Sequence, residues 1–224
     1  MNTTMQIKEA MYTRHTVRKF NGEPLPEDLQ EKLRLRAKDL NERFGLSISL
    51  VISDENPLNL MGRVFMGGEG FRSYFVLASE PHDGFEEQLG YASSDLVLFA
   101  QTLGLNTWWI GGTFDRKYVS ELIPGLKIVG IVAVGYGLNQ GVPHKSKAAS
   151  AVSKYNGEAP EWFNNGVEAA LLAPTALNRQ AFKIEGDGDT VRLSYAGGPL
   201  SDVDKGIVKH HFELGAGCEN FKWG

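Results

Sequence analysis

Two stretches of the chain repeat one order of secondary-structure signals, and each is opened by a proline. Pro26 begins a helical pattern, and the next strand pattern starts at Leu46, 20 residues later. Pro160 begins a second helical pattern, and the next strand pattern starts at Ala181, 21 residues later. Proline suits the first position of a helix because the N–H that it lacks would be unpaired there. A second strand and another helix follow in each stretch, which suggests an internal duplication.

Apolar periodicity and glycine or proline stops predict the other elements. Helical patterns cover residues 3–12, 27–44, 86–103, 115–122, 161–173 and 201–214. Strand patterns cover residues 46–52, 73–78, 106–110, 127–134, 181–185 and 190–195. The strand over 127–134 is apolar enough to be buried on both faces. The run Gly186-Asp187-Gly188-Asp189 predicts a hairpin between the last two strands.

The repeated order indicates three segments. Residues 1–140 form a first half, and residues 160–224 form a second half. Residues 141–159 are rich in glycine, serine and lysine and are expected to form a basic loop or linker. We expect the two halves to make one interdependent unit.

Composition excludes several classes of protein. The formal net charge of −4 lacks the basic excess of a polyanion binder, so no nucleic-acid partner is expected. No apolar run approaches the ~18 residues that span a bilayer, and the polar N-terminus lacks the apolar core of a signal peptide. The single cysteine, Cys218, excludes an intramolecular disulfide framework and a cysteine-rich metal site. A cytoplasmic protein without a membrane partner is therefore expected.

Several catalytic and metal-binding motifs are missing from the sequence. No serine or cysteine nucleophile motif, P-loop or G-x-G-x-x-G after a strand is found. The five histidines lack the spacing of metal ligands, and the adjacent pair His210-His211 is expected to point to different sides of its helix. We therefore predict no metal site and no catalytic acid or base.

Two basic clusters could bind an anion. Arg14 and Arg18 flank Thr16, beside His15, so two guanidinium groups and a hydroxyl could hold a phosphate or carboxylate. The alternative is a solvated basic turn. Lys145 and Lys147 could add two more cationic donors, although such a loop is often only a flexible surface segment.

Two further segments are suited to a planar ligand. The run from Ala173 to Gln180 carries amide and hydroxyl side chains that could meet the edge of a flavin or nucleobase, or could simply form a turn between helix and strand. Gly111 and Gly112 follow a predicted strand and leave their backbone N–H groups unobstructed. The preceding Trp108 and Trp109 are expected to serve in packing.

Together these segments resemble the FMN-dependent nitroreductase family. Arg14 to Phe20 is similar to the family's R-x-S-x-R/K-x-F signature, and Pro174 to Gln180 resembles its P-S-S-x-N-x-Q-P-W segment. Tyr91 to Gly112 is similar to its helix and glycine turn beside flavin N5, and Lys145-Ser146-Lys147 resembles its K-x-R pair at the phosphate. The resemblance implies an α+β fold with a mixed central sheet flanked by helices.

The resemblance also implies a function and a set of contacts. FMN would accept a hydride from NADH or NADPH at N5 and pass it, in a ping-pong cycle, to a nitroaromatic, a quinone or a similar acceptor. The implied FMN contacts are Arg14, His15, Thr16, Arg18, Gly111, Gly112, Lys145, Lys147, Pro174, Thr175, Ala176 and Asn178. The loop between Pro57 and Phe71 is the expected source of residues around the acceptor.

Two departures from the family pattern leave alternatives open. The first half has no counterpart of the asparagine segment over 36–44, and Ala181-Phe182 replaces the usual Pro-Trp. In family homodimers that segment comes from the partner subunit, so we expect a monomeric fused pseudo-dimer, with a homodimer as the alternative. A flavin-binding sensor or carrier with little turnover, or a flavin enzyme of related chemistry such as reductive dehalogenation or flavin fragmentation, are the other functional interpretations.

Overall fold

A computed structural model describes residues 3–224, with side chains described from Ile7 onward; Met1 and Asn2 of the predicted first half lie outside the described residues. The described chain forms two compact units. The N-terminal unit contains Thr13–Phe85 and Leu96–Pro143. The C-terminal unit contains the described residues up to Tyr12, together with Glu86–Asp95 and His144–Gly224. Each unit is therefore assembled from segments that are distant in the sequence.

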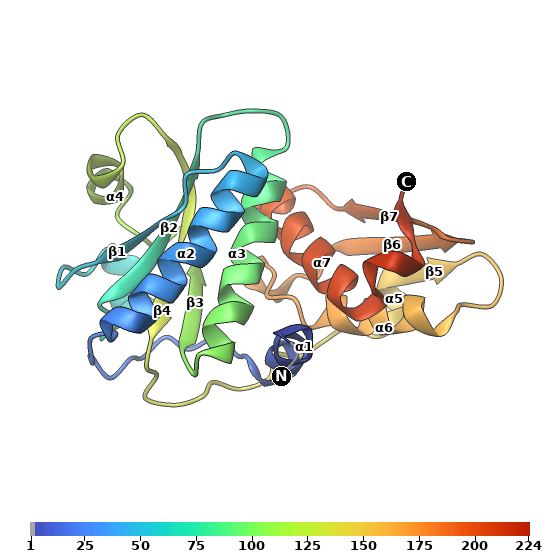
Figure 1. The fold of residues 1–224 in the computed structure, drawn as a ribbon, viewed down its shortest axis with the longest axis horizontal. Helices are drawn as coiled ribbons and strands as arrows, with labels where there is room; N and C mark the ends of the chain where they lie inside the picture. Colours follow the sequence, from blue (N-terminus) through green and yellow to red (C-terminus); the bar gives the residue numbers. More distant parts are fainter. Residues whose placement is uncertain (1–2) are drawn as a thin grey trace. The chain divides into compact units, whose positions relative to one another are not determined.

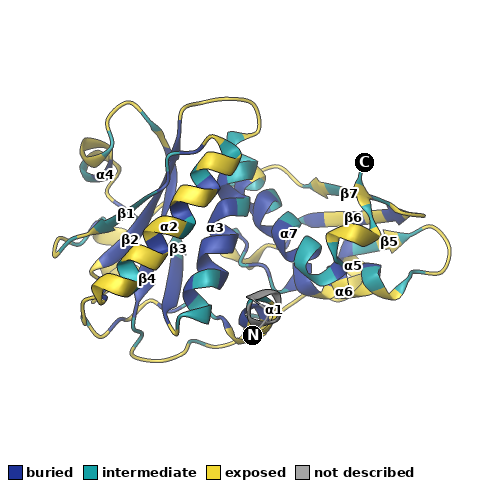
Figure 2. Ribbon diagram, viewed as in Figure 1, coloured by how far each residue is buried: buried dark blue, intermediate teal, exposed yellow. Residues whose placement is uncertain are grey.

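The N-terminal unit is built on an antiparallel sheet of four strands in the order β1-β2-β4-β3. The strands are β1 (Ser49–Ile52), β2 (Ser73–Ser79), β3 (Asn106–Ile110) and β4 (Lys127–Gly135). All residues of β2, and all of β4 after Lys127, are buried (Figure 2). The prediction of a strand covered on both faces over 127–134 is confirmed.

Helix α2 (Glu27–Phe44) lies against this sheet (Figure 1). Pro26 precedes its first residue, and Glu27 and Asp28 lie in its first turn, where the helix dipole favours negative charge. Its buried face carries Leu33, Ala37 and Leu40. Gly45 adopts a left-handed φ of 67° and ends the helix, as the sequence predicts.

An apolar cluster of this unit gathers around β2, β3 and β4. Phe20, Leu58 and Phe114 pack there with strand residues such as Tyr74 and Trp108. The short helix α4 (Arg116–Leu122) contributes Val119 and is capped by Asp115, whose carboxylate accepts from the N–H of Tyr118. The expectation that Trp108 serves in packing is confirmed, because this side chain is buried in the cluster.

The segment from 53 to 70 is predicted as a loop, but it contains the π-helix η1 (Met61–Phe65). The side-chain Oδ1 of Asn59 accepts from Gly62 N–H at 3.0 Å, and the backbone N–H of Asn59 donates to the Thr113 carbonyl at 3.1 Å. The turn is thus fixed by contacts with a distant segment, which local sequence patterns do not reveal.

The C-terminal unit contains a second four-stranded sheet, in the order β5-β6-β7-β8. Its strands are β5 (Ser153–Tyr155), β6 (Phe182–Asp187), β7 (Thr190–Tyr195) and β8 (Lys222–Trp223). The pair β6–β7 is antiparallel, and the pairs β5–β6 and β7–β8 are parallel. The predicted hairpin is confirmed, with Gly188 at a φ of 57° in its turn.

Helices α6 (Glu161–Leu171) and α7 (Ser201–Ala216) pack on each other in this unit. The unit also contains α1 (Thr3–Thr13), except for Thr13, and the short helix α5 (Ala149–Val152). The first part of α3 (Phe85–Thr102) also belongs here. A methyl group on Gly206 of α7 would overlap the carbonyl oxygen of Glu87, and one on Gly90 would overlap that of Val203. Glycine at both positions therefore lets the backbones of α3 and α7 come close together.

The α+β fold class is confirmed, but three details of the prediction differ. The strands form two sheets instead of one central sheet, because β4 ends at Gly135 and β5 pairs only with β6. The predicted linker over 141–159 contains α5 and β5. The two sheets also differ in their strand pairing, so the duplication and the division into halves stay predictions.

Candidate functional site

The basic segment after α1 is an extended stretch fixed along the edge of the first sheet. Thr16 bridges Thr107 of β3 in a parallel arrangement, and Val17 N–H donates to the Thr107 carbonyl at 3.0 Å. Phe20 N–H donates to the Glu69 carbonyl, and a side chain on Gly141 would collide with His15 and Thr16. The segment is therefore held on several sides by the backbone of its own unit.

Arg14 is buried at the start of this segment, with 5% of its surface exposed. Burial lowers the pKa of Arg14 to about 10, which still leaves the guanidinium charged at neutral pH. Among the described residues, none accepts a hydrogen bond from its buried Nε. A buried charge without a partner is costly, so this arrangement suits an anion that supplies the missing acceptor.

The other predicted contacts of the N-terminal unit lie near the surface. The exposed Arg18 guanidinium lies 5.7 Å from the centroid of the Trp108 ring, a cation–π distance. Gly111 and Gly112 follow β3 directly, and a methyl group built on Gly112 would meet no atom within 4 Å. The space beside the Gly112 Cα is thus unobstructed, and the role of Gly112 as an FMN contact stays a prediction.

The remaining predicted contacts lie together in the C-terminal unit. Lys147 N–H donates to the side-chain oxygen of Gln180 at 2.8 Å, and Lys147 Nζ donates to the Gln180 carbonyl at 2.9 Å. Asn178 Nδ2 donates to the Lys145 carbonyl at 2.8 Å, and its Oδ1 accepts from Gln180 Nε2 at 2.9 Å. The buried Gln180 therefore ties the lysine loop to the asparagine turn.

The turn that carries Asn178 has an unusual backbone. The φ angles of Leu177, Asn178 and Gln180 are 53°, 52° and 44°, values that residues other than glycine rarely adopt. Such conformations cost about 1–3 kcal/mol each and persist only where surrounding contacts impose them. Leu177 is 91% exposed, so burial of its side chain does not offset this cost. Strain of this kind is concentrated at functional sites in proteins.

Two residues that the sequence analysis missed hold the start of this turn. Asp204 of α7 is 3% exposed, and its Oδ1 and Oδ2 accept from Ala176 N–H at 2.9 and 3.0 Å. Tyr195 OH donates to Asp204 Oδ2 at 2.6 Å. Thr175 Oγ1 accepts from Gln180 N–H at 3.1 Å. Asp204 shares helical spacing with the apolar residues Ile207 and Val208 and with His211, and an acid on that face is the available signal.

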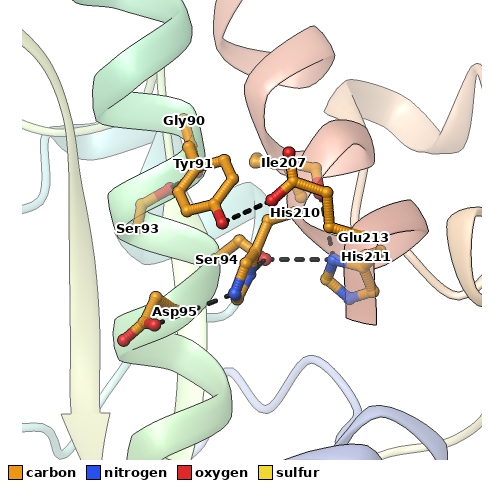
Figure 3. A network of polar contacts seen from close by, with 9 residues as sticks. All are labelled: Gly90, Tyr91, Ser93, Ser94, Asp95, Ile207, His210, His211 and Glu213. Carbon is orange, nitrogen blue, oxygen red and sulfur yellow. Dashed lines mark hydrogen bonds and ion pairs between the residues drawn. The ribbon is translucent and has the colours of Figure 1, made fainter. Parts of the chain in front are cut away.

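A second buried polar cluster joins α3 to α7 (Figure 3). Ser94 Oγ lies 2.9 Å from His210 Nδ1 and 3.0 Å from His211 Nδ1, and His211 Nδ1 lies 3.0 Å from the Ile207 carbonyl. Asp95 Oδ2 lies 3.7 Å from His210 Nε2. The expectation that the two histidines point to different sides is wrong, because both rings reach the same serine hydroxyl.

This cluster lies in the interior of its unit. Ser94, His210 and His211 are 1%, 4% and 0% exposed, so the hydroxyl is shielded from solvent. Over the described residues, no group of three or more histidine, cysteine or acidic side chains could hold a metal ion, and no helix is long and apolar enough to cross a membrane. The two groups of predicted contacts, one in each unit, remain the candidates for ligand binding.

Comparison with solved structures identifies the fold. A structure described as a "putative nitroreductase" from Thermotoga maritima is 24% identical to the chain, with a TM-score of 0.66, and the match covers 96% of this chain and 85% of that chain. A nitroreductase-like protein from Streptococcus mutans is 15% identical over 64% of this chain and 95% of its own, with a TM-score of 0.54. A "putative nitroreductase" from Desulfovibrio desulfuricans in complex with FMN is 15% identical over 69% of this chain and 96% of its own, with a TM-score of 0.52.

The family follows from a match along almost the whole sequence. No curated protein matches the chain. The family model described as "Putative TM nitroreductase" matches residues 6–216, a range that includes every predicted FMN contact. The chain belongs to this nitroreductase family.

Proposed function

We propose that the protein is an FMN-dependent oxidoreductase that takes a hydride from NADH or NADPH and passes it to a nitroaromatic, a quinone or a similar acceptor. One observation carries the proposal: Arg14 is a buried, charged guanidinium whose Nε has no acceptor among the described residues. A phosphate group would supply that acceptor and balance the charge. FMN is the phosphate-bearing cofactor that the family resemblance implies.

Names of the structural neighbours support the choice of cofactor. The Desulfovibrio desulfuricans structure is a complex with FMN, and so is one from Exiguobacterium sibiricum. A neighbour from Staphylococcus epidermidis is described as a "putative NAD(P)H:FMN oxidoreductase". These proteins are 13–15% identical to this chain, so their likeness supports the fold, and the extension to its cofactor is our proposal.

The chain's own residues are proposed to bind and orient the cofactor. Arg14 and Thr16 would hold the phosphate, with His15 beside them, and the exposed Arg18 would place positive charge at the pyrimidine edge of the flavin. The open backbone of Gly112, next to Gly111, would offer an N–H to the ring. When bound, FMN supplies hydride acceptance and release, so the protein needs no catalytic acid or base of its own.

The lysine loop and the strained turn carry the second set of proposed FMN contacts, those of the C-terminal unit. Lys147 Nζ retains two further hydrogens after donating to the Gln180 carbonyl, and Lys145 is exposed. Asn178 retains one amide hydrogen and one lone pair beyond its two internal bonds. Pro174, Thr175 and Ala176 would shape the turn. One FMN per chain is part of the proposal.

The absorption spectrum of the purified protein tests the proposal directly. We expect flavin absorbance in the near-ultraviolet and blue, one FMN per chain after denaturation, and bleaching when NADH or NADPH is added without oxygen. A protein that stays colourless when FMN is added would refute the proposed cofactor. A yellow protein that neither pyridine nucleotide bleaches would refute the oxidoreductase and favour a flavin-binding sensor or carrier.

Substitution of Arg14 tests the observation on which the proposal rests. Arg14→Ala should weaken FMN binding by roughly 10- to 150-fold, the loss of about 1.5–3 kcal/mol expected for a charged hydrogen bond. Arg14→Lys should recover part of that loss, since it restores the charge without the planar fork. Arg34→Ala is the control, because Arg34 lies on α2 and contacts Glu27 and Gln30. Equal FMN affinity in Arg14→Ala and Arg34→Ala would remove Arg14 from the site.

A further inference from the structure

The strained turn of the C-terminal unit is held at both ends by buried side chains. Gln180 holds its end, through hydrogen bonds to the backbone of Lys145 and Lys147. Asp204 holds its start, through the paired contacts of its carboxylate with Ala176 N–H. Between these anchors lie Leu177 and Asn178, both at positive φ and both exposed.

We propose that Asp204 is a positioning residue for the FMN contacts on the turn from Thr175 to Gln180. The inference rests on the proposed function. It goes beyond the family pattern, because Asp204 lies on α7, outside all the segments that resemble the family's motifs. Asp204 would act through the Ala176 N–H, without touching the cofactor itself.

The hydrogen bond from Ala176 N–H to the Asp204 carboxylate fixes the peptide group between Thr175 and Ala176. Asn178 N–H donates to the Thr175 carbonyl at 2.9 Å, and Arg179 N–H donates to the Ala176 carbonyl at 3.1 Å. The Thr175 carbonyl belongs to the same peptide group as the Ala176 N–H that the Asp204 carboxylate binds, and the Ala176 carbonyl belongs to the next one. A shift of that peptide group would therefore move the residues that fix the orientation of Asn178.

The carboxylate is kept at this position against the effect of burial. Burial raises the pKa of Asp204, although the hydrogen bonds from Tyr195 and Ala176 act in the opposite direction. An apolar residue of similar volume would avoid the cost of burying the carboxylate, but would leave Ala176 N–H and Tyr195 OH without their acceptor. Retention of a costly acceptor beside three strained residues is the pattern expected of a preorganised binding turn.

Variants of Asp204 separate the acceptor from the charge. Asp204→Asn keeps an oxygen that can accept from Ala176 N–H, and Tyr195 OH can then accept from the new amide. Asp204→Leu keeps the branched shape at Cγ and removes every acceptor. We expect Asp204→Asn to bind FMN within about threefold of the wild type and Asp204→Leu to bind at least about tenfold more weakly. Asp202→Leu is the matched control, since Asp202 is an exposed acid on the same helix.

The experiment combines FMN titration with amide hydrogen exchange at Ala176, Leu177 and Asn178 in protein stripped of flavin. Asp204→Leu should speed exchange at Ala176, whereas Asp204→Asn and Asp202→Leu should leave it near the wild-type rate. Wild-type FMN affinity in Asp204→Leu, or an equal loss in Asp204→Asn, would overturn the inference. If Asp204→Leu does not fold, Ala176→Pro is the second variant, because proline lacks the N–H that donates to Asp204. Wild-type FMN affinity in Ala176→Pro would also overturn the inference.

The two measurements keep the two proposals apart. A wild-type protein that binds no FMN refutes the proposed function, while hydrogen exchange still decides whether Asp204 holds the turn. A wild-type protein that binds FMN, combined with unchanged exchange in Asp204→Leu, refutes the positioning role and leaves the proposed function standing.

Discussion

Two buried polar clusters meet helix α7, and they differ in what they stabilise. The cluster of Ser94, Asp95, His210 and His211 joins two regular helices (Figure 3). The cluster of Asp204 and Tyr195 joins α7 to a turn with three non-glycine residues at positive φ. A polar cluster between regular helices serves packing, whereas one that sustains a strained and exposed turn serves presentation of that turn. Both clusters contain a buried acid and a hydroxyl group, so the types of residue alone would not distinguish them.

The largest effect is expected where α3 and α7 come closest. Gly206→Ala would place a methyl group against the Glu87 carbonyl and Tyr91 N–H, so the helices must separate. We expect a loss of about 3 kcal/mol or more in the free energy of unfolding, because backbone atoms cannot move aside as a flexible side chain can. Thermal or urea unfolding measures it, with Gly197→Ala as control, since no atom lies within 4 Å of a methyl group there. Equal stability of the two variants would show that the close helix contact is not required.

Ser94→Ala tests the helix–helix cluster itself. The hydroxyl contacts both His210 and His211, so its loss should cost about 1–3 kcal/mol in unfolding free energy. Ser93→Ala is the neighbouring control, because the Ser93 hydroxyl donates to the Gly90 carbonyl of its own helix, and its loss should cost less. FMN binding should be unchanged in Ser94→Ala. A selective loss of FMN affinity in that variant would abolish the distinction between the two clusters.

Local sequence patterns predict the scaffold of both clusters well. The strand over Asn106–Ile110, the left-handed end of α2 at Gly45 and the hairpin at Gly188 are all confirmed, because each depends on residues within a few positions. The polar segment that contains Asn178 was also recognised, from its concentration of amide and hydroxyl side chains.

Contacts between distant segments account for what the sequence does not show. The role of Asp204 depends on Ala176, 28 positions away, and η1 depends on Thr113. The prediction for the histidine pair is wrong because adjacent helical residues differ by about 100° in direction, yet both rings turn toward the Ser94 hydroxyl on the facing helix. The sequence around Arg14 predicts a basic residue in a polar segment, but the burial of Arg14 is not predictable from that local pattern.

Relief of backbone strain in the turn should raise the free energy of unfolding, whereas Ser94→Ala in the helix–helix cluster should lower it. Leu177→Gly places the residue that tolerates positive φ at an exposed position, so we expect stabilisation by about 0.5–1 kcal/mol. If the strained geometry serves binding, FMN affinity should fall while thermal stability rises. Leu177→Ala is the control, since it removes the exposed side chain without relieving φ. A destabilised Leu177→Gly would show that the turn is not under strain.

A pH dependence of stability is expected at the edge of the contact between α3 and α7. Burial raises the pKa of Glu87, but hydrogen bonds and attraction from Lys205 and Lys209, 2.8 and 3.0 Å away, outweigh burial and hold it below the usual range. A carboxyl with a lowered folded pKa contributes stability above its unfolded pKa, and this contribution is lost as pH falls through the folded value.

Glu87→Gln should therefore lower the free energy of unfolding by up to about 1 kcal/mol at pH 7 and flatten its decline below the ordinary titration range of glutamate. Unfolding in urea at several pH values measures both effects, with Glu86→Gln, in the first turn of α3, as the matched control. Asp204 should behave in the opposite way. Since its pKa is raised, the contribution from its protonated form is present at low pH and is lost as pH rises through the folded value. Ionisation of Glu87 therefore stabilises the contact between α3 and α7, whereas ionisation of Asp204 destabilises the fold. An acid that costs stability is what we expect at a position that serves binding.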